Sequence, residues 1–394
     1  MNAAAFFFAS TPHIHFGAGK RSKLGGIVAG YGSRLLLVTG GHSFDTSTRC
    51  RTLLTELQAQ FEIRRVKVAG EPSPQLVDAA VREHRDFGAD CVVAIGGGSA
   101  VDAAKAIAGL LPSGDSVMDY LEGVGAGKSY AGPSTPFIAV PTTAGTGGET
   151  SKNAVLSAQG KKGFKKSFRH ELLVAKHIIL DPELTLSCPP DVTAACGMDA
   201  FTQLLESYVS SQANPLTDAL ALSGMARVRD CLVRAVEQGD NPEARAGMLY
   251  ASSVSGLTLA NAGLGSVHGL ASPLGAFFPI PHGVVCGTLV SEASRMNIEL
   301  MQSREPDNPA LAKYAEAGRL LLNDPQLADE AARQGLLERL EAWTERLQIP
   351  RLAGYGITAA DIPRIVANSR GNSMKTNPIL LGDDEIAMLV RSRL

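Results

Sequence analysis

The sequence predicts two domains, an N-terminal α/β domain built on a parallel sheet and an all-α C-terminal domain. In the first part, short apolar runs rich in β-branched residues alternate with helical patterns, as in parallel sheets whose strands are joined by helices. After the pair Pro189-Pro190 these runs stop, and long helical patterns follow. We place the division in the turn-rich stretch 182–190, with residues 1–185 in the first domain and 186–394 in the second.

The expected strands are apolar almost throughout, which is typical of strands covered on both faces. They lie at residues 35–39, 63–68, 91–95, 136–140 and 177–180. We interpret the run AAAFFFA at residues 3–9 as the first strand, because it lacks a basic flank and is too short to span a membrane. Helices are expected between the strands, at residues 47–60, 74–87 and 99–111.

The second domain is expected to consist of long helices. Their periodic patterns cover residues 191–210, 215–236, 242–262, 283–303, 309–323 and 327–347. The polar stretch 302–308 is predicted to be a loop.

Composition excludes several classes of function. With 37 basic and 39 acidic residues the net charge is −2, so a surface for nucleic acid or an anionic membrane is not expected. No apolar run approaches the length of a membrane span. The six cysteines form no C-x-x-C pair, and we interpret them as free thiols in a reducing cytoplasm.

Two loops have the composition of a phosphate-binding site. The strand at 91–95 runs into Gly96-Gly97-Gly98, and Ser99 is expected to cap the following helix with Asp102 as its capping partner. This is not the G-x-G-x-x-G fingerprint, and a tight turn without a ligand remains the alternative. The second loop, PTTAGTGGE at 141–149, offers hydroxyl groups beside flexible backbone from Thr142, Thr143 and Thr146.

These motifs occur in an order that resembles the iron-containing (group III) alcohol dehydrogenases. The matching segments are GGGSAVDAAK (96–105), PTTAGTGGE followed by Asn153, LDPELT (180–185), GMDA (197–200), VHGLASPLGAFFPIPHG (267–283) and NSMKTNP (372–378). The resemblance spans nearly the whole chain and implies a dehydroquinate-synthase-like architecture. In it the first domain binds a dinucleotide and the helical domain holds metal and substrate.

The resemblance also implies which residues bind the cofactor. It places the cofactor pyrophosphate on Gly97, Gly98 and Ser99. Around the cofactor it places Asp102, Thr142, Thr143, Thr146 and Asn153. A lysine of the stretch 161–166 is expected to reach the ribose, and we choose Lys165; a solvated basic loop is the alternative for this stretch.

The end of the second expected strand bears on the choice between NADPH and NADH. An acidic residue there commonly binds the ribose 2′-hydroxyl of NAD and repels the 2′-phosphate of NADP. Here residues 40–43 read GGHS, and no acid precedes Asp45. Gly40 leaves room and Ser43 can donate to a phosphate, so we favour NADPH, with a turn that tolerates either cofactor as the alternative.

The resemblance implies a metal site in which one ligand differs. The family binds a divalent metal with one Asp and three His, and the matching positions are Asp199, Gln203, His268 and His282. Gln203 stands where the family has a histidine, and a neutral amide is a weak ligand for transition metals. Three interpretations stay open: metal is bound as Fe(II) or Zn(II), with Gln203 or water completing the shell; metal is weak or absent; or activity is lost.

A second departure lies in the substrate pocket. Many alcohol-oxidising members carry a histidine four residues after the first metal histidine, and here that position is Ser272. We therefore expect Ser272 to contact the substrate, and expect this substrate to differ from a simple alkanol. Lys375 could face a charged substrate, although a surface position is the simpler interpretation.

The expected function is NAD(P)H-dependent interconversion of an alcohol and an aldehyde or ketone by hydride transfer, metal-assisted and in the reducing direction. Asp199, His268 and His282 are the expected catalytic residues. A metal-independent reductase resembling maleylacetate reductase, a lyase resembling dehydroquinate synthase and a non-enzymatic cofactor-binding protein are the alternatives. The expected partners are a small-molecule substrate and a second copy of the chain, in a homodimer or higher homo-oligomer.

Overall fold

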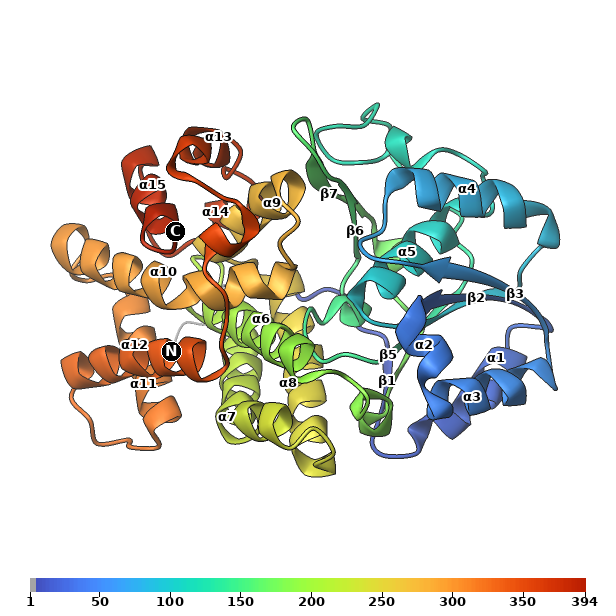
Figure 1. The fold of residues 1–394 in the computed structure, drawn as a ribbon, viewed down its shortest axis with the longest axis horizontal. Coiled ribbons are helices and arrows are strands. Elements are labelled where there is room, and N and C mark those ends of the chain that lie inside the picture. The colour runs from blue at the N-terminus through green and yellow to red at the C-terminus, as the bar shows by residue number, and fades with distance from the viewer. Residues whose placement is uncertain (1–4) are drawn as a thin grey trace.

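The computed structural model describes residues 5–394 and has a sheet-containing half and a helical half (Figure 1). The first half is built on a parallel six-stranded sheet of order β1-β8-β5-β4-β2-β3. Its strands are β1 His13–Phe16, β2 Arg34–Gly40, β3 Glu62–Val68, β4 Cys91–Gly96, β5 Phe137–Pro141 and β8 His177–Leu180. The predicted fold class is confirmed, and five predicted strands lie within one or two residues of observed ones.

The predicted first strand is wrong for residues 5–9, and residues 3–4 of that prediction lie outside the described part. Residues 5–12 form no strand, and β1 begins at His13. Phe6 and Phe7 are 48 % and 77 % exposed, and the backbone N–H of Ala9 donates to Asn261 Oδ1 instead of to a neighbouring strand. Apolar character alone does not make a strand, because a strand also needs a partner for its backbone hydrogen bonds.

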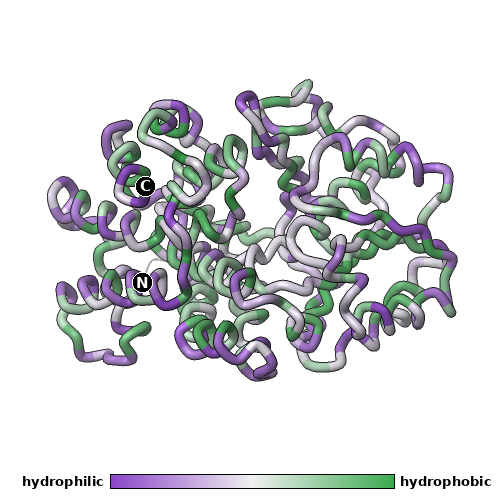
Figure 2. The backbone as a smooth tube through the Cα atoms, in the orientation of Figure 1, coloured by the Kyte–Doolittle hydropathy of each residue, from purple (hydrophilic) through white to green (hydrophobic). Residues whose placement is uncertain are grey.

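Helices cover both faces of the sheet, and alternating residues of each strand point to opposite faces. Leu36 and Val38 of β2 pack under α4 (Pro74–His84) and α5 (Gly98–Leu110). Leu35 and Leu37 pack against α1 Leu24–Ala29 and α3 Thr48–Gln58 on the other side. Figure 2 shows the resulting pattern, with hydrophobic central strands and hydrophilic outer loops. Because helices cover both faces, only the edges of the sheet and the ends of its strands are left for contact with ligands or other chains.

An antiparallel hairpin, which the sequence analysis did not predict, follows the second loop. It consists of β6 Asn153–Ala158 and β7 Phe164–Arg169. Its second strand reads FKKSFR, and the neighbouring lysines hide the alternation that predicts a strand. The short helix α2, His42–Thr46, was also not predicted. Both elements carry residues that were expected to bind the cofactor, namely Asn153 and Lys165 in the hairpin and Ser43 in α2.

The second half is helical, as predicted. The long helices are α6 Pro190–Val209, α7 Pro215–Glu237, α8 Pro242–Ala262, α10 His282–Arg304, α11 Ala310–Leu322 and α12 Asp329–Arg346. Three of them begin with proline, which suits the first helical position because its missing N–H is not needed there. Since α10 runs to Arg304, the loop predicted at 302–308 is wrong for its first three residues.

Four further helices in this half were not predicted. They are α9 Ser266–Phe277, α13 Ile362–Ala367, α14 Asn372–Lys375 and α15 Asp383–Arg391. Helix α9 is buried on nearly every side and contains Pro273, so it has no polar face to reveal its period. Within residues 5–394, no helix has the length and apolar character needed to cross a membrane.

The start of α5 differs from the prediction. Gly97, not Ser99, is the N-cap residue, and no side chain caps the helix. The predicted capping pair of Ser99 and Asp102 is therefore wrong, because both residues lie inside the helix. Helices whose first N–H groups have no side-chain cap can offer those groups to an anion.

Candidate active site

A cleft of about 1830 Å³ is lined by loops at the ends of the sheet strands and by helices of the second half. Its lining includes every residue that the sequence analysis singled out for cofactor, metal or substrate: Gly40, Ser43, Gly97, Gly98, Ser99, Asp102, Thr142, Thr143, Thr146, Asn153, Lys165, Asp199, Gln203, His268, Ser272 and His282. The exposed Lys375 lines it too. The fold thus brings these residues to one place, while the role of each remains a prediction.

The two phosphate-type loops pack directly against each other. A Cβ atom on Gly97 would lie 3.2 Å from Thr143 Oγ1, and one on Gly98 would lie 3.0 Å from Thr146 Oγ1. Any larger residue at either position would force the threonines away. The close approach leaves backbone N–H groups of the first turn of α5 and threonine hydroxyls on one wall of the cleft.

A buried lysine that the sequence analysis did not single out holds this wall together. Lys105 Nζ donates to the carbonyl oxygens of Gly148 at 2.6 Å, Ser151 at 2.8 Å and Asn153 at 2.7 Å. Burial lowers the pKa of this ammonium to about 8 despite the nearby carboxylates of Asp102 and Glu149. Lys105 therefore links α5 by three hydrogen bonds to the segment that leads from the loop after β5 into β6.

The two carboxylates beside Lys105 are also buried. Burial raises the pKa of Asp102 to about 6 and that of Glu149 to about 7, although the Lys105 charge opposes both shifts. Glu149 Oε1 lies buried without a hydrogen-bond partner. Asp102, which lines the cleft, and Glu149, which lies behind the lining, therefore have pKa values near neutral pH.

Lys165 reaches the cleft from β7 and is ion-paired there. Its Nζ lies 2.5 Å from Glu71 Oε1, and Glu71 Oε2 accepts from Ser157 Oγ at 2.5 Å. Ser272 Oγ donates to the carbonyl oxygen of Lys165 at 3.0 Å. The hairpin and α9 are thereby joined beside the predicted substrate position, and a freely solvated basic loop does not describe Lys165.

Three expected metal ligands converge from three helices. Asp199 lies on α6, His268 on α9 and His282 at the first position of α10. Asp199 Oδ1 is 3.2 Å from His268 Nε2 and 3.8 Å from His282 Nε2. Asp199 and His268 are buried, whereas the His282 side chain is 25 % exposed in the cleft.

The start of α10 can approach α6 this closely because residue 283 is glycine. A Cβ atom on Gly283 would lie 2.3 Å from the carbonyl oxygen of Ala195, which no side chain can accept. The sequence PHG therefore serves two purposes. It begins the helix after proline, and it brings the start of α10 against Ala195, which lies one turn of α6 before Asp199.

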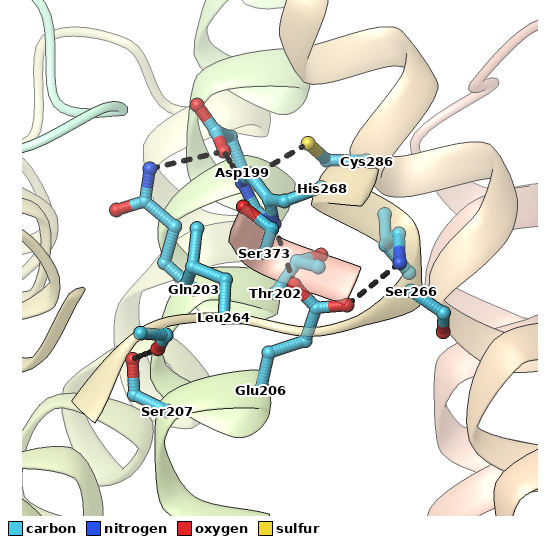
Figure 3. A network of polar contacts seen from close by, with 12 residues as sticks. Asp199, Thr202, Gln203, Glu206, Ser207, Leu264, Ser266, His268, Cys286 and Ser373 are labelled. Atoms are coloured by element: carbon cyan, nitrogen blue, oxygen red, sulfur yellow. Dashed lines mark hydrogen bonds and ion pairs between the residues drawn. The ribbon is translucent and has the colours of Figure 1, made fainter. Parts of the chain in front are cut away.

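A second carboxylate, Glu206, fixes the orientation of His268. Its Oε2 lies 2.6 Å from His268 Nδ1, and its Oε1 accepts from the backbone N–H of Val267 at 2.7 Å (Figure 3). With the Nδ1 hydrogen donated to Glu206, His268 Nε2 points at Asp199. Carboxylates of this kind hold metal-binding histidines in the required tautomer.

Charge and burial act differently on the two histidines. Burial lowers the pKa of His268, but Cys286, Glu206 and Asp199 outweigh it and raise that pKa well above its usual value. Burial and the charge of Lys165 lower the pKa of His282 to about 4, although Asp199 opposes this. His282 is therefore neutral at pH 7, as a metal ligand must be.

The cluster contains a fourth donor that the sequence analysis missed. Cys286 Sγ lies 3.6 Å from His268 Nε2 and 3.9 Å from His282 Nε2, and the four donor atoms lie within 4.8 Å of one another. The available signal was spacing, because Cys286 follows His282 by four residues on one helix and therefore shares its face. The sequence analysis treats Cys286 only as one of six free thiols.

Gln203 lies beside the cluster with its amide nitrogen inward. Its Nε2 is 3.4 Å from Asp199 Oδ1 (Figure 3). Its Oε1 accepts from Ser255 Oγ at 2.8 Å. The oxygen is the atom that could bind a metal, and here it contacts Ser255 instead. In this arrangement Gln203 supports the carboxylate, and its expected place in the metal shell stays a prediction.

Comparisons with known sequences decide the family. The sequence model described as iron-containing alcohol dehydrogenase matches residues 11–182, and the one for the C-terminal part of this family matches residues 193–394. The chain belongs to the iron-containing alcohol dehydrogenase family. It is 32 % identical over 343 residues to alcohol dehydrogenase 4 of Saccharomyces cerevisiae, which covers 85 % of each chain.

Solved structures agree with this assignment. The structure of a 1,3-propanediol oxidoreductase matches with a TM-score of 0.89 and 28 % identity, over 99 % of this chain and 100 % of that one. The sulfoacetaldehyde reductase of Bifidobacterium kashiwanohense, solved with NAD⁺, matches with a TM-score of 0.83 and 28 % identity, over 99 % and 98 %. This iron-containing alcohol dehydrogenase family member is therefore an oxidoreductase that interconverts alcohols and aldehydes, in a family that binds metal and uses a nicotinamide cofactor.

Proposed function

We propose that this protein uses NADPH to reduce a small aldehyde or ketone to the alcohol, with a divalent metal held by Asp199, His268 and His282. One observation carries the proposal. The three donor groups converge from separate helices onto the same cleft that the two phosphate-type loops line. A dinucleotide on those loops and a carbonyl compound at the donor cluster would then share one cavity.

The cofactor proposal rests on the wall formed by α5 and the threonine loop. Uncapped N–H groups at the start of α5 suit a pyrophosphate, and we assign that contact to Gly97, Gly98 and Ser99. We assign the remaining cofactor contacts to Asp102, Thr142, Thr143, Thr146, Asn153 and Lys165.

The preference for NADPH is proposed from the end of β2. Gly40 and Ser43 line the cleft there, and the first acid after the strand is Asp45. That carboxylate is occupied by Arg65 at 2.7 Å and Lys67 at 2.8 Å. An unpaired carboxylate at this place would repel the 2′-phosphate of NADPH, and here the charge is already neutralised.

The donor set fits a transition metal. A carboxylate and two imidazoles, of which His268 must give up a proton to bind, with room for a substrate oxygen suit catalytic Zn(II) and also Fe(II). When bound, the metal supplies Lewis-acid polarisation of the carbonyl oxygen. The residues supply its position, since Glu206 holds the His268 tautomer and Gly283 allows His282 to approach Asp199.

The remaining residues orient the substrate and limit water. Ser272 donates its hydroxyl hydrogen to the Lys165 carbonyl, so its oxygen faces a substrate as an acceptor. The Lys165–Glu71 pair lies beside it and presents both charges at one end of the pocket. We propose that this end receives the polar part of a substrate that is more polar than a simple alkanol.

We also propose the division into domains at residues 185/186, a homodimer or higher homo-oligomer, and a cytoplasmic location. The oligomer is supported by β1, which lies at the sheet edge with Ile14 47 % and Phe16 39 % exposed. Edges of this kind are commonly covered by a second chain.

Turnover with a panel of short, hydroxylated and acidic aldehydes tests the function. We expect NADPH oxidation with an equal yield of alcohol, and a larger kcat/KM for NADPH than for NADH. The control is the same panel without enzyme. Cofactor binding without turnover over the panel would contradict the enzymatic proposal. Turnover of a substrate without net oxidation of the cofactor would favour the lyase alternative.

A further inference from the structure

We infer that Cys286 is a metal ligand in this protein, so that the centre consists of one carboxylate, two imidazoles and one thiolate. The inference rests on the proposed function insofar as that function places a metal at Asp199, His268 and His282. It goes beyond it because it assigns the fourth position, which neither the family pattern nor the sequence analysis gives to a cysteine.

The first argument is the position of the sulfur. Cys286 lies one turn after His282 on α10, and its Sγ is 3.6 Å from His268 Nε2 and 3.9 Å from His282 Nε2. Around a tetrahedral zinc ion, bonds of about 2.3 Å to sulfur and about 2.0–2.1 Å to nitrogen place these ligand atoms about 3.6 Å apart. The sulfur therefore stands where a fourth ligand would stand.

Two further separations lie near the same geometry, and all four donor atoms lie within 4.8 Å of one another. Asp199 Oδ1 is 3.2 Å and 3.8 Å from the two imidazole nitrogens. The bond lengths of zinc to nitrogen and oxygen predict about 3.4 Å for such a pair. Within residues 5–394, these four side chains are the group of His, Cys, Asp and Glu residues whose donor atoms converge in this way.

The second argument is the surroundings of Cys286. Its side chain is fully buried, and its sulfur lies within reach of His268, His282 and the Asp199 carboxylate. Buried cysteines elsewhere, such as Cys231 on α7, lie in an apolar core. Cys286 is also part of that core, but it alone turns its sulfur to the ligand nitrogens of the cluster.

The third argument is the orientation of Gln203. Its oxygen accepts from Ser255 at 2.8 Å, and its nitrogen faces the Asp199 carboxylate at 3.4 Å. In this orientation the atom that faces Asp199 is the amide nitrogen, which has no free lone pair for a metal. The family has a histidine on α6 where this chain has Gln203. We infer that the fourth donor comes instead from α10, as the sulfur of Cys286, which lies on the other side of Asp199 in Figure 3.

A thiolate ligand changes the charge of the centre. With Asp199 and Cys286 both anionic, a divalent ion is neutralised, whereas one carboxylate and three imidazoles leave one positive charge. Thiolate also favours a borderline-soft ion such as Zn(II). Substrate oxygen would then bind as a fifth ligand, an expansion that zinc permits.

Cobalt substitution of the whole protein tests the inference without using activity. Co(II) added to the metal-free wild-type protein should give tetrahedral visible bands together with a near-ultraviolet sulfur-to-cobalt charge-transfer band. The variant Cys286→Ser, which keeps the side-chain size, should retain visible bands and lose the charge-transfer band. The variant Cys231→Ser is the matched control and should keep both.

Zinc affinity, measured by competition with a chromophoric chelator, supplies the second readout. Removing ligand support alone commonly weakens metal binding 10–100-fold, so we expect Cys286→Ser to weaken zinc binding by about 100-fold or more. The double variant Gln203→His/Cys286→Ser should bind zinc at least about tenfold more tightly than Cys286→Ser alone, because it returns an imidazole to the cluster. The double variant should still show no charge-transfer band.

The outcomes separate the two proposals. Visible cobalt bands without a charge-transfer band in the wild type, and equal zinc affinity in Cys286→Ser, would overturn the thiolate ligand and leave the metal centre standing. A wild-type protein that binds neither Co(II) nor Zn(II) would overturn the thiolate ligand and also the metal part of the proposed function.

Discussion

At the scale of single residues, burial decides the protonation of the acid Glu149, which lies behind the cleft wall beside Lys105. Glu149 is 3 % exposed and one of its oxygens has no partner, so ionising it in the folded protein is unfavourable. Lys105 moderates this cost but does not contact Glu149 through a hydrogen bond, because its three short donations go to backbone carbonyls.

A pH dependence follows for Glu149. Burial raises its pKa from the ordinary 4.5 to about 7, so the folded state binds more protons than the unfolded state between these values. The free energy of unfolding therefore falls as the pH rises through this window. The variant Glu149→Gln has no group that titrates here, so its free energy of unfolding should not fall in this way. The free energy of unfolding of the variant minus that of the wild type should therefore be about 1–3 kcal/mol larger at pH 7 than at pH 5.

Urea unfolding of both proteins at the two pH values measures this difference. The matched control is Glu56→Gln, which changes an exposed glutamate on α3 and should follow the wild type at both pH values. A constant difference between Glu149→Gln and the wild type across the window would contradict the assigned cause.

Residue identities at the site could be predicted wherever a local motif determined them. Asp199, His268 and His282 follow from GMDA, VHG and PHG, and the structure brings them together. Cys286 could not be assigned from its type alone, because a buried thiol in an apolar helix is usually only packed. Its role depends on the crossing of α9 and α10, which is a tertiary contact.

At the scale of elements, close helix–loop contacts set the shape of the cleft. Helix α8 touches the loop after β5 at two glycines, Gly256 and Gly147. A Cβ atom on Gly256 would lie 2.0 Å from the carbonyl oxygen of Gly147 and 2.3 Å from Thr150 Oγ1. Gly147 itself has φ of 60°, which glycine adopts without strain.

Replacing Gly256 with alanine should therefore destabilise the protein and loosen the cofactor wall. Because the new methyl group would contact rigid backbone, we expect a loss of at least about 1–3 kcal/mol in the free energy of unfolding. Cofactor affinity should fall as well, since the displaced loop carries Thr146. Chemical unfolding and fluorescence titration with NADPH measure the two effects.

The matched control for this substitution is Gly26→Ala in α1. No atom lies within 4 Å of a Cβ placed there, and alanine favours a helix over glycine, so this variant should be unchanged or slightly more stable. Equal free energies of unfolding for Gly256→Ala and the wild type would contradict the prediction, because the backbone at Gly147 would then have moved to accommodate the methyl group at little cost.

Elements with one clear period were predictable, and elements buried on all sides or shaped by a partner were not. The long helices α7 and α8 begin at Asn-Pro pairs, which are visible in the sequence. Helix α9 and the hairpin β6–β7 have no such signals, because α9 lacks a polar face and β7 is rich in lysine. The strand prediction for residues 5–9 was wrong for a different reason. These residues are apolar, but they have no neighbouring strand to pair with.

At the scale of the whole molecule, the cleft unites two chemistries that arise in different halves. In the proposed function, the sheet half supplies backbone N–H groups and hydroxyls for an anionic cofactor, and the helical half supplies carboxylate, imidazole and thiol groups for a metal. Net charge is near zero, so the proposed cofactor binding would depend on these local groups and not on a basic surface. Composition alone could exclude nucleic acid, but it could not identify the cluster.

The central claim is that a metal at Asp199, His268 and His282 is required for aldehyde reduction. Its most direct test is the rate of NADPH oxidation with an aldehyde substrate, measured together with metal content before chelation, after chelation and after return of Zn(II) or Fe(II). Asp199→Asn, which keeps the side-chain size, is measured in parallel. Because Lewis-acid polarisation contributes several kcal/mol to the transition state, chelation and Asp199→Asn should each lower the rate at least about 100-fold. Returned metal should restore only the wild type. An unchanged rate in the metal-free wild-type protein would contradict the claim and favour a metal-independent reductase.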